Sequence, residues 1–383
     1  MIRDLSDEEA RVAFPLKWGA ASRDVLPAWV AEMDYAPAEP LTEALHRAVR
    51  DGRFGYPRFG PGGELGEAYA GFARRQFGSS VDPDHVLPVV DVTAGVRLAL
   101  DVLSEPGAVV LPVPAYSPHH DIGVITGRER VDLVLDPDAP RAEIDLDRLD
   151  RLLRDGARTL LLTQPHNPWG RVFTRAELEG IRDVVARHRG RVVSDEVHGP
   201  LVLPGAEHLS YLEIEGTHDH AVALVSASKA FNIAGLRSAQ VIVPDRTAME
   251  QLILAPPARN DSWSSLGVAA AVACYRDGDD WLAALRVRLD AQRTLLGGLL
   301  AEHLPDARMR PLEATYLAWI DLRAYGHPEP ARVARTRGRV LVSAGQEFQP
   351  DLPGHIRLNV ATSPERLTEI VRRLATALTA PEG

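Results

Sequence analysis

Short apolar runs alternate with segments of helical periodicity along the middle of the chain. A short run of consecutive apolar residues, bounded by turn residues, is typical of a strand that is buried on both faces of a parallel sheet. The pattern predicts such strands at residues 109–111, 159–162, 192–193, 222–225 and 240–243.

Helical segments lie between several of these runs. The clearest spans residues 174–188, where Thr174 and Glu177 have the spacing of a capping box. A second helix is predicted over 64–77 from apolar residues at helical spacing. Strands that alternate with helices indicate an α/β fold with a mostly parallel sheet covered on both faces. Such sheets bind ligands beyond the carboxyl ends of their strands.

The pattern changes after Trp263. A helical region over 264–303 precedes strand-like runs at 316–321, 340–343 and 356–360, and a last helix is predicted over 364–378. This order indicates a second, smaller α+β domain. We therefore expect an N-terminal arm or segment of the small domain over 1–45, a large domain over 46–275 and a small domain over 276–383.

Composition narrows the class of protein. The 383 residues are 45% hydrophobic and 25% charged, which is typical of soluble globular proteins. The formal net charge of −10 argues against a general nucleic-acid binder, because phosphate backbones require a basic surface. No run approaches the ~20 apolar residues of a membrane span. Acidic residues from position 4 onward do not fit a secretory signal, so we expect no membrane partner and a cytoplasmic location.

The chain has a single cysteine, Cys274, in a stretch of small apolar residues. One cysteine cannot form a disulfide framework or a cysteine-based zinc site within one chain. We expect it to be a buried structural thiol.

Polar residues that could carry chemistry follow three of the predicted strands. Because the carboxyl ends of parallel strands meet at one edge of a sheet, we expect these side chains to lie close together. In chain order they are Asn167, Asp195, His198, Ser226, Ser228, Lys229 and Arg237.

Each of these residues also has a structural explanation when it is taken alone. Asn167 begins an Asn-Pro turn, and Asp195 could cap a helix. Lys229 is harder to explain, because it lies between an apolar strand and the apolar pair Ala230 and Phe231, where a free ammonium group is costly. Desolvation lowers the pKa of a lysine and makes its amine a usable nucleophile.

Together these motifs resemble the fold-type I pyridoxal phosphate (PLP) enzymes of the aminotransferase class I/II superfamily, over nearly the whole chain from Trp29 to Leu374. The resemblance implies the fold of that group and PLP as the cofactor. It implies these roles: Lys229 forms the Schiff base, Asp195 pairs with the pyridine nitrogen, Asn167 meets the ring oxygen, Tyr116 stacks on the ring, and Arg357 binds the α-carboxylate of an amino-acid substrate.

The resemblance also implies a cradle for the cofactor phosphate. The segment 94–97 resembles a glycine turn at a helix N-terminus, where backbone N–H groups attract anions. Tyr56 resembles a tyrosine that reaches the phosphate of the neighbouring subunit, which implies a homodimer with sites at the interface. The residues expected to form the cradle are Gly95, Val96, Arg97, Ser226, Ser228, Arg237 and Tyr56.

Three further segments are similar to the cystathionine β-lyase (MalY and PatB type, C–S lyase) branch of the superfamily: residues 29–35, 195–198 and 231–236. The implied reaction is an α,β-elimination, in which Lys229 removes the Cα proton and a thiolate leaves Cβ. Cystathionine or a related cysteine S-conjugate would then give a thiol, pyruvate and ammonia.

Two side chains near this expected site have no single interpretation. Trp169 stands where the family commonly has a threonine, so it could narrow the pocket or stack on a substrate, or it could pack on the surface of the large domain. His198 could line the pocket by its position. His119 and His120 are expected to begin a solvated helix.

Other functions remain as alternatives. An aminotransferase would use the same lysine, aspartate and arginine, and would differ only in the step after the Cα proton has left. A non-catalytic PLP-binding regulator is a more remote alternative, since the resemblance leaves little room for a DNA-binding module. A metal site or a serine hydrolase is disfavoured, because the 13 histidines include no H-E-x-x-H spacing and there is no G-x-S-x-G sequence.

Overall fold

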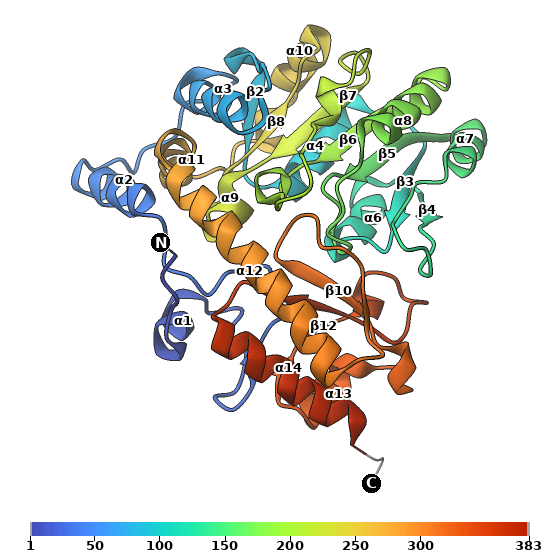
Figure 1. Ribbon diagram of the computed structural model, residues 1–383. Helices are drawn as coiled ribbons and strands as arrows, with labels where there is room; N and C mark the ends of the chain where they lie inside the picture. Colours follow the sequence, from blue (N-terminus) through green and yellow to red (C-terminus); the bar gives the residue numbers. More distant parts are fainter. Residues whose placement is uncertain (1, 381–383) are drawn as a thin grey trace.

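The computed structural model describes residues 2–380, and its larger part is built on a seven-stranded sheet (Figure 1). The strand order across the sheet is β2-β8-β7-β6-β5-β3-β4. All five predicted strands are confirmed as members of this sheet. Its strands are β2 Val86–Val89, β3 Ala108–Val113, β4 Arg130–Val134, β5 Ala157–Thr163, β6 Arg191–Asp195, β7 Ala221–Val225 and β8 Ala239–Ile242.

The sheet is mostly parallel, as predicted. Neighbouring strands from β4 to β7 run parallel, whereas β8 runs antiparallel to both β7 and β2. The carboxyl ends of β5, β6 and β7 therefore lie side by side at one edge, which is the edge where Thr163 and Asp195 end their strands.

Helices cover both faces of the sheet, because successive side chains of each strand point to opposite sides. Leu160 and Leu162 of β5 belong to one core cluster and Leu161 to the other. The capping box of Thr174 and Glu177 is present at the start of α8, as predicted. The first face packs against α3 Gly63–Phe77, α7 Leu146–Arg154, α8 Arg175–Arg187 and α11 Ser265–Asp277, and the second against α4 Val92–Leu103, α6 Ile122–Thr126 and α10 Arg246–Leu254.

The C-terminal part contains a second, four-stranded sheet of order β12-β13-β10-β9 (Figure 1). The predicted last helix is confirmed as α14, which packs against α12 and α13. The elements are α12 Asp279–His303, β9 Arg308–Met309, β10 Leu317–Asp321, α13 Pro330–Thr336, β11 Val340–Leu341, β12 Ser343–Ala344, β13 His355–Asn359 and α14 Pro364–Thr379.

The helical region predicted over 264–303 is confirmed, and it is divided at Gly278 into α11 and α12. A Cβ atom at Gly278 would lie 2.4 Å from the Cys274 carbonyl oxygen and from the Phe231 ring, so the chain turns where only glycine fits. The strand expected over 340–343 is two short strands, since β11 pairs with the N-terminal β1 Leu26–Pro27 and β12 pairs with β13.

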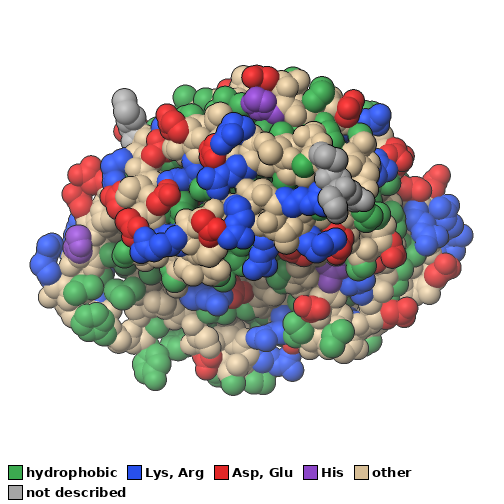
Figure 2. All heavy atoms as spheres, turned by 90° about the horizontal axis from the view of Figure 1, so that it is seen from below, with side chains coloured by type: hydrophobic (Ala, Val, Ile, Leu, Met, Phe, Trp, Pro, Cys, Tyr) green, Lys and Arg blue, Asp and Glu red, His purple; other side chains and the backbone are tan. Residues whose placement is uncertain are grey.

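The remaining helices are short or peripheral, and they are α1 Asp7–Ala13, α2 Glu39–Arg50, α5 Ser117–His120 and α9 Ala227–Ala230. Among residues 2–380, none of the helices is long and apolar enough to cross a membrane. Charged side chains of both signs intermingle on the face seen from below (Figure 2). On α14, Arg372 and Glu369 form such a pair of opposite charges, 2.8 Å apart.

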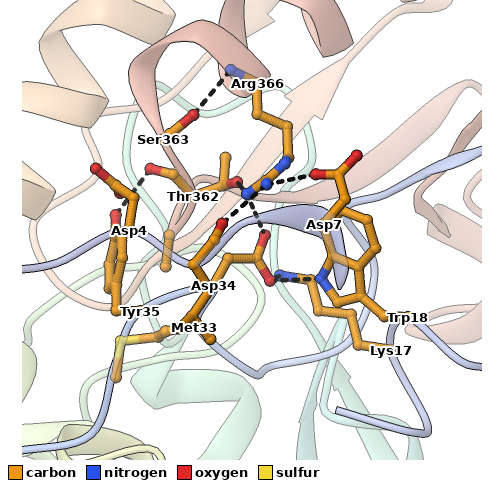
Figure 3. A network of polar contacts seen from close by, with 12 residues as sticks. Asp4, Asp7, Lys17, Trp18, Met33, Asp34, Tyr35, Thr362, Ser363 and Arg366 are labelled. Carbon is orange, nitrogen blue, oxygen red and sulfur yellow. Dashed lines mark hydrogen bonds and ion pairs between the residues drawn. The ribbon is translucent and has the colours of Figure 1, made fainter. Parts of the chain in front are cut away.

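A buried network of hydrogen bonds and ion pairs around Asp34 connects the N-terminal segment to α14 in the C-terminal part (Figure 3). The fully buried Asp34 carboxylate accepts hydrogen bonds from Lys17 Nζ at 2.8 Å and Trp18 Nε1 at 2.7 Å. Arg366 of α14 lies 3.5 Å from its other oxygen and also contacts Asp7. The network and the separate two-stranded β1–β11 pair join the first 34 residues to the C-terminal part. The domain boundaries at 45 and 275 stay a prediction.

We predict that Asp34→Asn lowers the free energy of unfolding by about 3 kcal/mol, because it leaves the buried Lys17 ammonium without a counter-charge. Chemical denaturation of the two proteins measures the difference. A Glu8→Gln variant serves as the control, because Glu8 pairs with Arg23 on the surface. Loss of this exposed ion pair should leave the free energy of unfolding nearly unchanged. Equal stability of the Asp34→Asn variant and the parent would contradict the prediction.

Candidate active site

A cavity of about 170 Å³ lies at the carboxyl ends of β5, β6 and β7. Thr163 and Asp195 end two of these strands and Ser226 follows the third, while the start of α4 forms the opposite wall. The cavity brings together predicted residues from four separate stretches of sequence: Tyr116, Asn167, Asp195, His198, Ser226, Ser228, Lys229 and Arg237.

Lys229 lies on the single turn of α9, directly after β7. The Ser226 hydroxyl accepts a hydrogen bond from the Ser228 N–H at 3.0 Å and donates one to the Ser238 carbonyl at 2.8 Å, which holds this turn against the start of β8. Burial, and next the positive charge of Arg357, lower the pKa of Lys229 to about 8. About a tenth of the amine is therefore neutral at pH 7, far more than for an ordinary lysine, and a nucleophile or a base requires this neutral form.

Lys229 is also one of only two lysines in the chain. The other is Lys17, which is buried in the ion pair with Asp34. Any chemistry that needs a lysine amine at a cavity can therefore take place only at Lys229. This distribution is a property of the sequence, and it strengthens the prediction for this residue.

Asp195 is the buried acid of the cavity. Its Oδ1 accepts a hydrogen bond from the Val197 N–H at 3.1 Å, and burial raises the pKa of its carboxyl to about 7. A cationic ring nitrogen brought next to this carboxyl would favour its ionised form. The Asp195 side chain therefore fits the partner of a protonated heterocycle.

His119 stands behind Asp195, with its Nε2 3.5 Å from Asp195 Oδ2. The expectation that His119 begins a solvated helix is wrong, because the residue is fully buried and packs edge-on against the Tyr116 ring. Both ring nitrogens of His119 lack a hydrogen-bond partner among residues 2–380. His119 follows Tyr116, the N-cap of α5, by three positions. Residues three apart lie on the same side of a helix, so the sequence contained a signal that His119 faces the site with Tyr116.

Arg357 reaches the same region from β13 of the second sheet. Its guanidinium donates to Asn167 Oδ1 at 3.2 Å and to the Trp29 carbonyl at 3.0 Å, and it lies 4.6 Å above the Phe348 ring. No carboxylate among the described residues lies within 4.0 Å of it, although Arg357 is buried. Burial lowers the pKa of Arg357 to about 10. A buried guanidinium without a counter-ion fits a ligand carboxylate.

The anion-binding end of the cavity differs from the prediction. The helix α4 begins at Val92 and not at Gly95, so the backbone N–H groups exposed at its N-terminus are those of Val92 and Thr93. Gly95 instead lets the helix approach the sheet, since a Cβ there would lie 2.7 Å from Leu224 Cδ1. Val96 is buried in the core and Arg97 is exposed, and neither lines the cavity. The helix start predicted within 94–97 is therefore wrong by about one turn, and the role of Gly95, Val96 and Arg97 in phosphate binding stays a prediction.

Comparison with known proteins identifies the family. The sequence pattern of the family "Aminotransferase class I and II" matches residues 22–374. The chain belongs to this family. It is 38% identical over 391 residues to a protein of Mycobacterium tuberculosis with the provisional name cystathionine beta-lyase, covering 95% of this chain and 94% of the relative. It is 33% identical over 373 residues to the cystathionine beta-lyase of Corynebacterium glutamicum, covering 97% and 98%.

A solved structure agrees with this assignment. The chain superposes with a TM-score of 0.93 on a protein of Corynebacterium diphtheriae, provisionally assigned as a PLP-dependent beta-cystathionase. The two are 32% identical, and the superposition covers 99% of this chain and 100% of the other. The predicted fold, that of the class I/II aminotransferase family, is thereby confirmed.

Two further predicted residues, Tyr56 and Trp169, lie away from the cavity that a single chain forms. Tyr56 is 91% exposed, in a separate hollow beside Trp263. Trp169 is buried among apolar side chains that include Trp319 and Phe348, below the Arg310 guanidinium. This position favours packing over a direct substrate contact. Phe348, which belongs to the same apolar cluster as Trp169, also packs against the Arg357 guanidinium. Trp169 can therefore influence Arg357 indirectly, through the Phe348 ring.

Buried histidines give the site a pH dependence. Burial lowers the pKa of His119 to about 4 and the pKa values of His166 and His198 to about 3. Below pH ~6.5 the unfolded chain protonates these rings while the folded chain keeps them neutral, so each of them removes stability as the pH falls. The raised pKa of Asp195 acts in the opposite direction, because the folded state holds that proton below about pH 7.

We predict that His198→Gln makes stability less dependent on pH. Between pH 6 and 5 the slope of the free energy of unfolding against pH should decrease by about 1.4 kcal/mol per pH unit, the contribution of one proton. Urea denaturation of the cofactor-free proteins at several pH values measures both slopes. Slopes that coincide would mean that His198 takes up a proton in the folded state.

Proposed function

We propose that this chain is a PLP-dependent carbon–sulfur β-lyase that acts on cystathionine or a related cysteine S-conjugate and releases a thiol, pyruvate and ammonia. The observation that carries the proposal is that an amine and a buried acid, Lys229 and Asp195, line one small cavity. A buried guanidinium without a carboxylate partner, Arg357, donates a hydrogen bond to Asn167 in the wall of the same cavity. These are the groups that an amino-acid substrate and a pyridoxal ring require.

The residues present fit the cofactor. Asp195 would pair with the ring nitrogen and Asn167 would meet the ring oxygen, while Tyr116 lies in the same cavity wall. The phosphate would lie at the α4 N-terminus, within reach of Ser226, Ser228 and Arg237. When bound, PLP supplies a ring that withdraws electrons from the substrate Cα.

The chain's own residues would perform the remaining steps. The Arg357 guanidinium would bind the substrate α-carboxylate, which fixes the orientation of the Cα–H bond. The Lys229 amine would then accept the Cα proton, since burial keeps much of it neutral near pH 8. Burial of these groups would also exclude water from the reacting atoms.

The choice of lyase over aminotransferase is supported by the relatives, which are named for cleavage of cystathionine. Both reactions use the same lysine, acid and arginine, and they diverge after the proton has left Cα. An aminotransferase is therefore the alternative, and it would need a keto acid as second substrate.

We also propose that the active form is a homodimer in the cytoplasm. Three aromatic side chains of one loop are half or more exposed: Phe54, Tyr56 and Phe59. Exposed aromatic rings of this kind are typical of a protein interface. Tyr56 would reach the phosphate of the partner's site. An active monomer in sedimentation experiments would contradict this assembly.

The first test uses the purified holoenzyme with L-cystathionine and no keto acid. We expect continuous release of pyruvate and thiol, whereas an aminotransferase would stop after converting its bound cofactor. Lys229→Ala should lower turnover by about 10⁴-fold because the base is lost. In the parent, borohydride reduction followed by peptide mapping should attach the cofactor to the Lys229 peptide. Attachment elsewhere, or full turnover of Lys229→Ala, would refute the proposal.

The role of Arg357 gives a separate prediction. Arg357→Lys keeps the charge but loses the forked geometry, so the KM for cystathionine should rise by about 10- to 100-fold while kcat changes less. Steady-state kinetics separates the two constants. A loss confined to kcat would place Arg357 outside substrate binding.

A further inference from the structure

The anion-binding end of the cavity contains an acid. Asp91 is the N-cap of α4, where its Oδ1 accepts a hydrogen bond from the Ala94 N–H at 2.8 Å. Its Oδ2 accepts one from Arg237 Nη1 at 2.6 Å. Both Asp91 and Arg237 line the cavity, next to Val92 and Thr93. The Asp91 carboxylate therefore accepts hydrogen bonds from the N-terminus of α4 and from Arg237, the two groups that would also bind a phosphate.

This arrangement opposes the binding of a phosphate on electrostatic grounds. A helix N-terminus and an arginine attract a dianion, and a carboxylate a few Å away repels it. A phosphate in this cradle would have to share Arg237 with Asp91. The Asp91 side chain is one-third exposed, so water weakens the repulsion without removing it.

We propose that the Asp91 carboxylate competes with the cofactor phosphate for Arg237 and for the N-terminus of α4. In the cofactor-free chain its carboxylate neutralises Arg237 and caps α4, which keeps the empty cradle ordered. In the loaded chain the same charge weakens the hold on the phosphate, so that Asp91 sets the affinity for PLP. The inference rests on the proposed cofactor, but it does not depend on which reaction follows.

The opposite role makes a different prediction. If Asp91 served only to orient Arg237 toward the phosphate, its removal would weaken cofactor binding. The two roles therefore differ in the sign of the change, and one charge-removing variant distinguishes them.

The test is the dissociation constant of PLP from the cofactor-free protein, measured by equilibrium dialysis and by quenching of tryptophan fluorescence. Asp91→Asn removes the charge and retains a side chain that caps helices well. We expect it to bind PLP about tenfold more tightly than the parent, the effect of removing one nearby like charge. Pyridoxal, which lacks the phosphate, should bind both proteins with the same affinity within about twofold.

Asp101→Asn is the matched control, because Asp101 lies on the same helix and also faces an arginine, Arg259, at 3.6 Å, but does not line the cavity. Its affinity for PLP should equal that of the parent. Asp91→Ser, which also caps the helix, provides a second variant if Asp91→Asn is poorly folded.

Unchanged or weaker PLP binding by both Asp91 variants would overturn the inference, and so would an equal gain for pyridoxal. Absence of PLP binding in the parent itself would instead refute the proposed cofactor. The two failures are therefore distinguishable in one set of measurements.

Discussion

The constraint on which the site depends is the removal of ionisable groups from water at one edge of a sheet. Lys229 and Asp195 line a cavity of about 170 Å³, and Arg357 contacts Asn167 in its wall. Burial is the first cause of the pKa shift of each of the three. Burial makes the lysine and the arginine less basic and the aspartate less acidic. Isolated in water, the Lys229 amine would be almost entirely protonated at neutral pH, and it could not act as a base.

The N-terminal segment makes this burial possible by joining the two parts of the chain. The Trp29 carbonyl accepts a hydrogen bond from Arg357, and the Met33 backbone is paired with the side chain of Asn232, three residues after Lys229. The buried network around Asp34 holds this segment in place (Figure 3). The arm is thus a wall of the site as well as a link between its halves.

The distribution of cations gives the site its chemical specificity. Arginine supplies nearly all the positive charge of the chain, and only Lys17 and Lys229 are lysines. An arginine cannot act as a nucleophile or a base near neutral pH, because its pKa is too high. The cavity therefore has one lysine amine for covalent chemistry. The charge of Arg357 acts on this amine, and a second arginine, Arg237, is paired with Asp91 at the α4 N-terminus.

The sequence by itself determined the elements whose signals are local. Apolar runs identified the central strands, the Thr174 and Glu177 pair identified the start of α8, and polar residues after β5, β6 and β7 identified much of the cavity lining. These signals are local because strand burial, capping and strand ends each depend on a few adjacent residues. The lysine and the acid of the cavity can therefore be recognised from the sequence alone.

Only the tertiary structure decided the features that depend on packing between distant segments. Arg357 meets Asn167 across 190 positions of sequence, and Phe231 packs so closely on Gly278 that no side chain fits there. The helix α4 begins one turn before Gly95, after its N-cap Asp91, and Gly95 packs on the sheet. His119 turns inward to Asp195, and Trp169 fills a junction outside the cavity. Periodicity cannot show these contacts, because it records which face of an element is buried but not what that face meets.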